Sequence, residues 1–138
     1  MDILPIPARM VDRVWRYVRP ALERAIYKSR SGEDIEAWRV GCERGRGHIL
    51  IVLADGEESK GAIILQRDGD ALLCVALAGD RGLIDEVPGL ISAWRKIAVD
   101  NGYERITLKG RRGWERVLAR HGFKDCGGGF LGASSHGI

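Results

Sequence analysis

The segment Gly102–Lys124, GYERITLKGRRGWERVLARHGFK, constrains the fold of this chain more than any other stretch of the sequence. Its pattern predicts a buried strand over Arg105–Leu108, a Gly-rich turn, a short helix over Gly113–His121, and a second strand that opens with Phe123. Gly122 stands directly after the helix, at a position where glycine commonly ends helices. A strand, a helix and a strand in close succession indicate a fold that combines helices with a β-sheet.

Two helices are predicted before the first long strand. Apolar residues recur at three- and four-residue steps through the first of them, which indicates one buried face: Val11, Val14, Trp15, Val18, Leu22, Ala25 and Ile26. Pro20 falls within this run, and because proline lacks an N–H we expect it to kink the helix or to split it in two. A weaker second helix is predicted over Asp34–Glu43.

A three-stranded meander and a third helix are predicted next. The strands are expected over His48–Ala54, Lys60–Gln66 and Ala71–Ala78, and the last of them, ALLCVALA, is apolar throughout, as strands at the centre of a sheet are. Asp68-Gly69 suits the two-residue turn of a hairpin. The third helix begins near Val87, with its apolar stripe on one side.

The resulting order, α-α-β-β-β-α-β-α-β, predicts a single-domain α/β (α+β) protein with a mixed sheet that is antiparallel at its start. The expected domain covers residues 1–131, with a short strand near Phe130. Residues 132–138, which end in SSHGI, are expected to form a flexible C-terminal tail.

Composition excludes several classes of protein. The chain has 138 residues, which is the length of one domain, and no apolar run approaches the ~20 residues that span a bilayer. The N-terminus, MDILPIPARM, does not have the apolar core of a signal peptide. Cys42, Cys74 and Cys126 lie far apart without metal-ligand spacing, so we expect reduced thiols and no metal site.

The net charge of +3 is distributed unevenly. Residues 9–30 contain seven basic and two acidic residues, and residues 102–124 have the same balance, whereas residues 31–101 contain eight basic and thirteen acidic residues. Basic surfaces attract nucleic acids and acidic proteins. Because no recognition motif accompanies the charge, a solvated helix face is the favoured interpretation, and nucleic-acid binding is a possible alternative.

Three segments carry a resemblance to a known family. They are the buried strand ALLCVALAG, which leads into a helix through Arg81-Gly82, the helix end AVDNGYERITL, and the helix end LARHGF. In these segments and in the order of its elements, the chain resembles the GNAT superfamily of acetyltransferases across roughly residues 8–131. The resemblance implies a GNAT-like fold and raises the possibility of an acetyl-CoA-dependent N-acetyltransferase.

The resemblance also implies where acetyl-CoA would bind. The backbone of Val75, Ala76 and Leu77 would hold the pantetheine arm, and Arg81 and Gly82 would lie near the pyrophosphate. In active members of the family this turn reads Arg/Gln-x-x-Gly-x-Gly/Ala, which lets backbone N–H groups at a helix N-terminus approach the anion.

Two positions of that turn depart from the family pattern. Ile84 and Glu86 stand where the family has small residues, and Asp85 adds a second carboxylate. Carboxylates repel a pyrophosphate, but they stabilise the N-terminus of a helix that binds no anion. The sequence therefore favours a structural helix start, with no cofactor expected unless the acetyltransferase alternative holds.

Residues suited to acid–base catalysis are also missing. Leu118 occupies the position at which many members of the family place a tyrosine that protonates the leaving thiolate. Asp68 and Asp70, which could serve as a general base, are better explained by the hairpin turn. His48 begins a strand and His121 closes a helix. No catalytic residue is predicted.

The segment GRRGW, Gly110–Trp114, resembles small GNAT-like proteins of tailed bacteriophages and prophages. That resemblance implies a phage-associated accessory or virion protein, located in the host cytoplasm or in the virion, with a protein partner and without a membrane partner. Trp114 is expected to anchor the helix, and Arg111 and Arg112 to form a paired cationic site for the partner. Two solvated arginines are the equally weighted alternative.

Three functions remain open from the sequence. The first is a GNAT-fold phage-associated protein that acts through protein contacts without acetyltransferase activity, with a binding surface at Arg111, Arg112 and Trp114. The second is an acetyl-CoA-dependent N-acetyltransferase with an atypical pyrophosphate turn. The third is a nucleic-acid-binding module that uses the basic helices.

Overall fold

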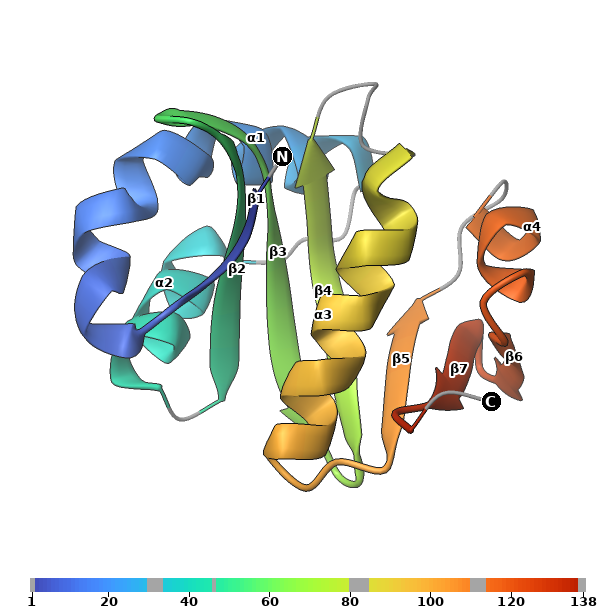
Figure 1. Cartoon of the computed structure of the whole chain (residues 1–138). Coiled ribbons are helices and arrows are strands. Elements are labelled where there is room, and N and C mark those ends of the chain that lie inside the picture. The colour runs from blue at the N-terminus through green and yellow to red at the C-terminus, as the bar shows by residue number, and fades with distance from the viewer. Residues whose placement is uncertain (1, 30–33, 46, 80–84, 110–113, 137–138) are drawn as a thin grey trace. The chain divides into compact units, whose positions relative to one another are not determined.

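The computed structural model describes residues 2–29, 34–45, 47–79, 85–109 and 114–136 (Figure 1). The elements in the described part of the chain are β1 (Asp2–Ile6), the 3-10 helix η1 (Ala8–Met10), α1 (Val11–Ser29), α2 (Ile35–Arg44), β2 (His48–Asp55), β3 (Glu58–Asp68), β4 (Ala71–Gly79), α3 (Val87–Asp100), β5 (Arg105–Lys109), α4 (Trp114–Ala119), β6 (Lys124–Gly127) and β7 (Phe130–Ser134). The strands are hydrogen-bonded in the order β1-β2-β3-β4-β5-β7-β6. The predicted fold class, a mixed sheet combined with α-helices, is confirmed.

Two compact units make up the chain. The first contains Met1–Gln66 and Ala76–Glu86, and the second contains Arg67–Val75 and Val87–Ile138. In the first unit β1, β2 and β3 form an antiparallel meander, with Pro5 opposite Ile51 in the β1–β2 ladder. Helices α1 and α2 pack against each other in this unit. Its core includes fully buried apolar side chains from α1 and β2: Val11, Val18, Leu22, Leu50, Ile51 and Leu53.

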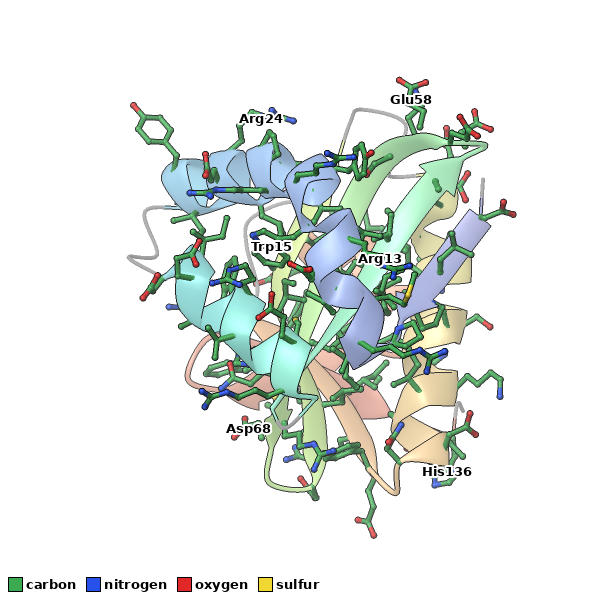
Figure 2. All side chains as sticks on the ribbon, turned by 90° about the vertical axis from the view of Figure 1, so that its left-hand side faces the viewer. Arg13, Trp15, Arg24, Glu58, Asp68 and His136 are labelled. Carbon is green, nitrogen blue, oxygen red and sulfur yellow. The ribbon has the colours of Figure 1, made fainter. Side chains whose placement is uncertain are left out.

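Helix α1 is continuous from Val11 to Ser29, with Pro20 inside it, so the expected split does not occur. Its N-terminal part, near Arg13, and its C-terminal part, near Arg24, run in different directions (Figure 2). A bend of this kind is the usual effect of an internal proline, because the ring crowds the carbonyl of the preceding turn. The predicted kink is therefore confirmed.

Strand β1 was not predicted from the sequence. Its segment DILPI contains a proline and has no alternating pattern, since exposed and half-buried residues follow one another without a fully buried position. Proline is tolerated in an edge strand because one side of that strand needs no ladder hydrogen bond. β1 is such an edge strand, being hydrogen-bonded to β2 at one end of the strand order.

The second unit contains α3 and the strands β5, β6 and β7, together with the first part of β4. Buried side chains stand opposite one another on its neighbouring strands: Leu72 of β4, Ile106 of β5 and Ala133 of β7. Trp94 of α3 donates a hydrogen bond of 3.0 Å from Nε1 to the carbonyl of Leu72, and its ring centroid lies 5.7 Å from that of Phe123. These contacts fasten α3 to the sheet and to the segment that follows α4.

The C-terminal region differs from the sequence prediction. α4 ends at Ala119, two residues before the predicted end at His121, whereas β6 follows Phe123 and β7 begins at Phe130, where strands were expected. β7 is antiparallel to both β5 and β6 and extends to Ser134. Ser135 is only 2% exposed, and its hydroxyl donates a hydrogen bond of 2.6 Å to the carbonyl of Tyr103. The expected boundary at 131/132 is therefore corrected, because residues 132–135 belong to the packed unit.

No helix in the described ranges has the length and apolar character needed to cross a membrane.

Candidate functional site

Strand β4 is the element to which the GNAT resemblance assigns the acetyl-CoA arm. β4 and β5 are parallel and pair from Ala71 opposite Arg105 to Cys74 opposite Leu108. These are the pairs among the described residues, where β5 extends to Lys109 and β4 to Gly79. The predicted cofactor residues Val75, Ala76 and Leu77 are the three that follow Cys74.

The three predicted cofactor residues are buried or half-buried. Ala76 is 7% exposed, whereas Val75 and Leu77 are half-buried. The binding of a CoA thioester along these residues stays a prediction.

The residues around the N-terminus of α3 do not favour the pyrophosphate of such a ligand. Arg81, Gly82 and Ile84 lie outside the described residues. Asp85, which is exposed, and Glu86, which is half-buried, stand immediately before Val87, the first residue of α3. A like charge at ~4 Å costs on the order of 1–4 kcal/mol in a partly solvated site, so these two carboxylates disfavour an anion at this helix end.

The position of the family's proton donor is apolar and buried. Leu118 of α4 is 3% exposed. Its carbonyl accepts hydrogen bonds from the N–H groups of His121 and Phe123 at the end of the helix. An aliphatic side chain in this place packs and transfers no proton.

Asp70, considered in the sequence as a general base, has a structural role. Its Oδ1 accepts hydrogen bonds of 3.1 and 2.9 Å from Nε and Nη2 of Arg105, and its carbonyl accepts from the N–H groups of Glu104 and Arg105. The hydrogen bond from the Arg105 guanidinium lowers the pKa of the Asp70 carboxyl. A carboxylate stabilised in this way is a weaker base, so the interpretation as a turn residue is favoured.

The cysteines do not form a nucleophilic site. Cys42 of α2 is 2% exposed, and burial raises the pKa of its thiol to about 12. Cys126 is exposed, and its thiol lies 3.4 Å from the carbonyl of Phe130. The described residues contain no cluster of three or more His, Cys, Asp or Glu side chains that could hold a metal ion.

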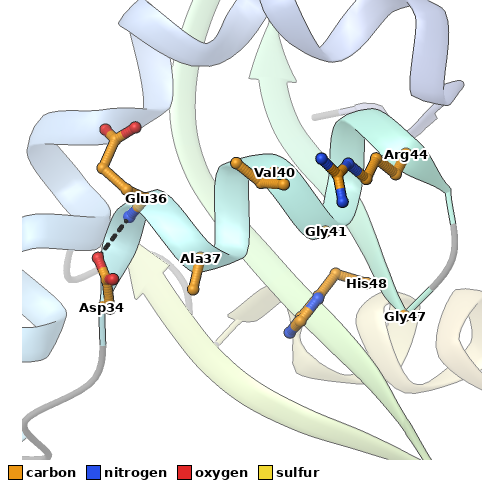
Figure 3. Close-up of a pocket in the computed structure, with 8 residues that line it drawn as sticks. All are labelled: Asp34, Glu36, Ala37, Val40, Gly41, Arg44, Gly47 and His48. Carbon is orange, nitrogen blue, oxygen red and sulfur yellow. Dashed lines mark hydrogen bonds between the residues drawn. The ribbon is translucent and has the colours of Figure 1, made fainter.

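An open depression of ≈ 550 Å³ lies along α2 and was not foreseen from the sequence (Figure 3). Its lining residues are Asp34, Glu36, Ala37, Val40, Gly41, Arg44, Gly47 and His48. The absence of a side chain at Gly41 is required here, because an added Cβ would overlap the imidazole of His48. Asp34 caps the helix by accepting a hydrogen bond of 2.9 Å from the N–H of Glu36.

The depression brings together none of the predicted site residues. The sequence signal for the depression was a set of residues that recur at three- and four-residue steps and so share one face of α2: Asp34, Ala37, Gly41 and Arg44. The floor is mostly apolar, with the carboxylates of α2 toward one end of the helix and Arg44 toward the other.

The predicted partner-binding residues can be placed only in part. Arg111 and Arg112 lie outside the described residues. Trp114 is the first residue of α4. The paired cationic site therefore stays a prediction.

Comparisons with other proteins establish the fold. No protein-family model matches the sequence, and no curated protein matches it either. Among solved structures, the PaiA N-acetyltransferase from Thermoplasma acidophilum in complex with coenzyme A is similar with a TM-score of 0.65 at 15% identity, over 97% of this chain and 99% of that chain. A probable acetyltransferase from Staphylococcus epidermidis reaches a TM-score of 0.73 at 9% identity, over 96% and 98% of the two chains.

A GNAT-family acetyltransferase from Staphylococcus aureus Mu50 gives a TM-score of 0.67 at 12% identity, over 97% of this chain and 98% of that chain. Likenesses at such low identity establish architecture and not activity. The fold of this chain is that of the GNAT acetyltransferases, as the order of its predicted elements indicated.

Proposed function

We propose that this chain is a GNAT-fold protein that acts through protein contacts and does not transfer an acetyl group. The observation that carries the proposal is Leu118, which stands at the proton-donor position and is 3% exposed. Asp70 supports it, because its carboxylate is held by Arg105 and its pKa is lowered. The two carboxylates before α3, Asp85 and Glu86, add repulsion toward a pyrophosphate.

The proposed role is that of a phage-associated accessory or virion protein. It rests on the resemblance of the Gly110–Trp114 segment to small phage proteins, and the partner would bind at Arg111, Arg112 and Trp114. Neighbouring genes for terminase, portal or capsid proteins are the expected genomic context. A chromosomal neighbourhood without any phage gene would contradict this part of the proposal.

An acetyl-CoA-dependent N-acetyltransferase is the second candidate, and the similar solved structures favour it. The similar Thermoplasma structure is an N-acetyltransferase in complex with coenzyme A. Val75, Ala76 and Leu77 would hold the pantetheine arm, and Arg81 and Gly82 would bind the pyrophosphate. Acetyl-CoA would supply the activated acetyl group.

Two measurements with acetyl-CoA separate the two candidates: thermal melting reports whether it binds, and thiol release reports whether its acetyl group is transferred. A ligand at a hundred times its dissociation constant stabilises the folded state by ~2.7 kcal/mol, which raises the melting temperature by several degrees. The first proposal predicts no release of free thiol when acetyl-CoA and a panel of primary amines are added. Thiol release that depends on both the protein and an amine would overturn it.

A substitution at Glu86, one of the two carboxylates before α3, tests where the pyrophosphate would bind. If acetyl-CoA binds, Glu86→Gly is expected to tighten binding because it removes a carboxylate near the expected pyrophosphate. Lys96→Gln, an exposed change elsewhere on α3, is the matched control and is expected to leave binding unchanged. Weaker binding of the Glu86→Gly variant would show that the turn is not the anion site.

A further inference from the structure

One exposed face of α1 combines arginines with exposed tyrosines. Arg13, Arg16, Tyr17, Arg24 and Tyr27 are all exposed, and at 3.6 residues per turn they fall on one side of the helix. We call these five residues the α1 stripe. Arg13 and Arg24 lie on the two halves of the helix (Figure 2). Measured along the bent helix, the stripe covers about 20 Å, given a rise of 1.5 Å per residue.

The arginines of the α1 stripe are not neutralised within the described part of the chain. Two other arginines of this unit, Arg19 and Arg39, are in ion pairs: Arg19 binds Glu23 at 2.6 Å, and Arg39 binds Glu36 and Glu43 at 2.9 and 2.8 Å. Among the described residues no carboxylate forms an ion pair with the three arginines of the stripe. Their positive charge is therefore available to an anionic partner.

The tyrosines of the stripe present their rings to solvent. Tyr27 is 84% exposed and Tyr17 is 57% exposed. The Arg16 guanidinium lies over the Tyr17 ring, 4.8 Å from its centroid, and donates a hydrogen bond of 2.7 Å to the Tyr17 hydroxyl. Planar groups arranged in this way offer flat surfaces on which a base can stack.

We propose that the α1 stripe binds single-stranded nucleic acid, with its arginines at the phosphates and its tyrosines against the bases. The presence of both arginines and tyrosines favours this partner over an acidic protein. An acidic peptide would contact only the arginines, whereas a single strand would contact the arginines through its phosphates and the tyrosine rings through its bases. The inference concerns a surface that the proposed function does not use. It does not depend on whether acetyl-CoA binds.

The first test measures the salt dependence of binding. Fluorescence anisotropy with a labelled oligo-uridine of about 12 nucleotides gives the affinity over a series of salt concentrations. Each phosphate contact on a single strand contributes about −0.7 to the slope of log K against log salt. The variant R13Q/R16Q/R24Q is expected to reduce the steepness of that slope by about two.

A variant with the same loss of charge elsewhere is the matched control. Arg67, Lys96 and Lys124 are exposed and lie outside the first unit's helices. The variant R67Q/K96Q/K124Q removes the same number of positive charges and is expected to keep the wild-type slope. Equal slopes for both triple variants would overturn the proposal, as would the absence of binding to the oligo-uridine at low salt.

The second test separates stacking from charge. Tyr27→Ala is expected to weaken binding about tenfold, whereas Tyr27→Phe, which keeps the ring, retains wild-type affinity. Because Tyr27 is largely exposed, both variants are expected to melt at the wild-type temperature. Unchanged affinity of Tyr27→Ala, or equally tight binding of poly-glutamate to wild type, would show recognition of negative charge alone and would overturn the proposal in favour of an acidic protein partner.

Discussion

The guanidinium of Arg95 on α3 donates a hydrogen bond of 2.7 Å from Nη2 to the backbone carbonyl of His121, just beyond α4. Its Nε donates a second one, of 3.3 Å, to the carbonyl of Ser134 at the end of β7. Carbonyls at a helix end lack intrahelical partners and interact favourably with a cation. One side chain of α3 thus holds the ends of two later elements of the same unit.

Replacing Arg95 by alanine is expected to lower the free energy of unfolding by about 1–3 kcal/mol, because hydrogen bonds to a charged donor are lost. Chemical denaturation followed by circular dichroism measures this change. Lys96→Ala is the matched control on the same helix, since Lys96 makes only an exposed ion pair with Asp100 and its loss is expected to cost less than about 0.5 kcal/mol. Equal effects of the two variants would contradict a structural role for Arg95.

The helix ends that carried the family resemblance share one local structure. At the end of α3, the N–H of Tyr103 donates to the carbonyl of Ala98 at 2.8 Å, and the N–H of Gly102 donates to that of Val99. The same two hydrogen bonds link Phe123 to Leu118 and Gly122 to Ala119 after α4. Both are Schellman caps, which require a residue with positive φ followed by an apolar residue.

This explains why the sequence predicted the fold better than the activity. Glycine followed by an aromatic residue, as in AVDNGY and LARHGF, specifies a helix end through backbone geometry and burial. Such a signal is local, so it could be found without knowing which elements meet. It carries no information about catalysis, which depends on side chains brought together from distant parts of the chain.

Substituting Gly102 by alanine is expected to destabilise the protein by about 1 kcal/mol. The φ of Gly102 is +80°, a backbone conformation that is unfavourable for an L-residue with a side chain. An added Cβ would have no atom within 4 Å, so a steric clash does not contribute. Gly102→Asn should cost less, since asparagine tolerates this region. Thermal and chemical denaturation measure both changes.

Gly47→Ala is the control for that prediction. A Cβ at Gly47 also meets no atom within 4 Å, but its φ is not in the left-handed region. The substitution is expected to be neutral or slightly stabilising, because alanine restricts the unfolded chain. A Gly47→Ala variant as unstable as Gly102→Ala would contradict the conformational explanation.

What the sequence missed has physical causes as well. β1 is a strand through its backbone pairing with the edge of β2, and nothing in DILPI by itself indicates a strand. The extent of β7 to Ser134 was missed because the segment KDCGGGFLGAS contains consecutive glycines, which hide the alternation expected of strands. The depression along α2 depends on His48, which comes from β2 and contacts Gly41 only after the two elements pack.

The ion pair of Asp70 with Arg105 is expected to make stability depend on pH at the acidic end. The pKa of Asp70 is lowered in the folded state by the hydrogen bond from Arg105, so the unfolded state binds a proton more readily. The resulting stabilisation is fully present above the unfolded pKa of about 3.9 and is lost as pH falls through the lower folded pKa. Melting temperatures of wild type and Asp70→Asn are therefore expected to differ near neutral pH and to converge as pH falls through the lowered folded pKa of Asp70.

Salt provides the check on that interpretation. Both side chains are about half exposed, at 52% for Asp70 and 48% for Arg105, so the pair is screened. The difference between wild type and Asp70→Asn near neutral pH is expected to shrink in about 1 M salt. A difference that persists at low pH would instead show that the substitution disturbs the hairpin backbone.

Alkylation is expected to distinguish the buried Cys42 from the exposed Cys126. Burial raises the pKa of the Cys42 thiol to about 12, so near pH 8 only roughly one molecule in 10⁴ carries the reactive thiolate at this position. Iodoacetamide added to the folded protein should therefore modify Cys126 long before Cys42, as followed by mass spectrometry of peptides. In denaturant both residues lose their native surroundings and should react at similar rates. Rapid modification of Cys42 in the folded protein would show that α2 opens locally, because neither its 2% exposure nor its raised pKa allows direct attack.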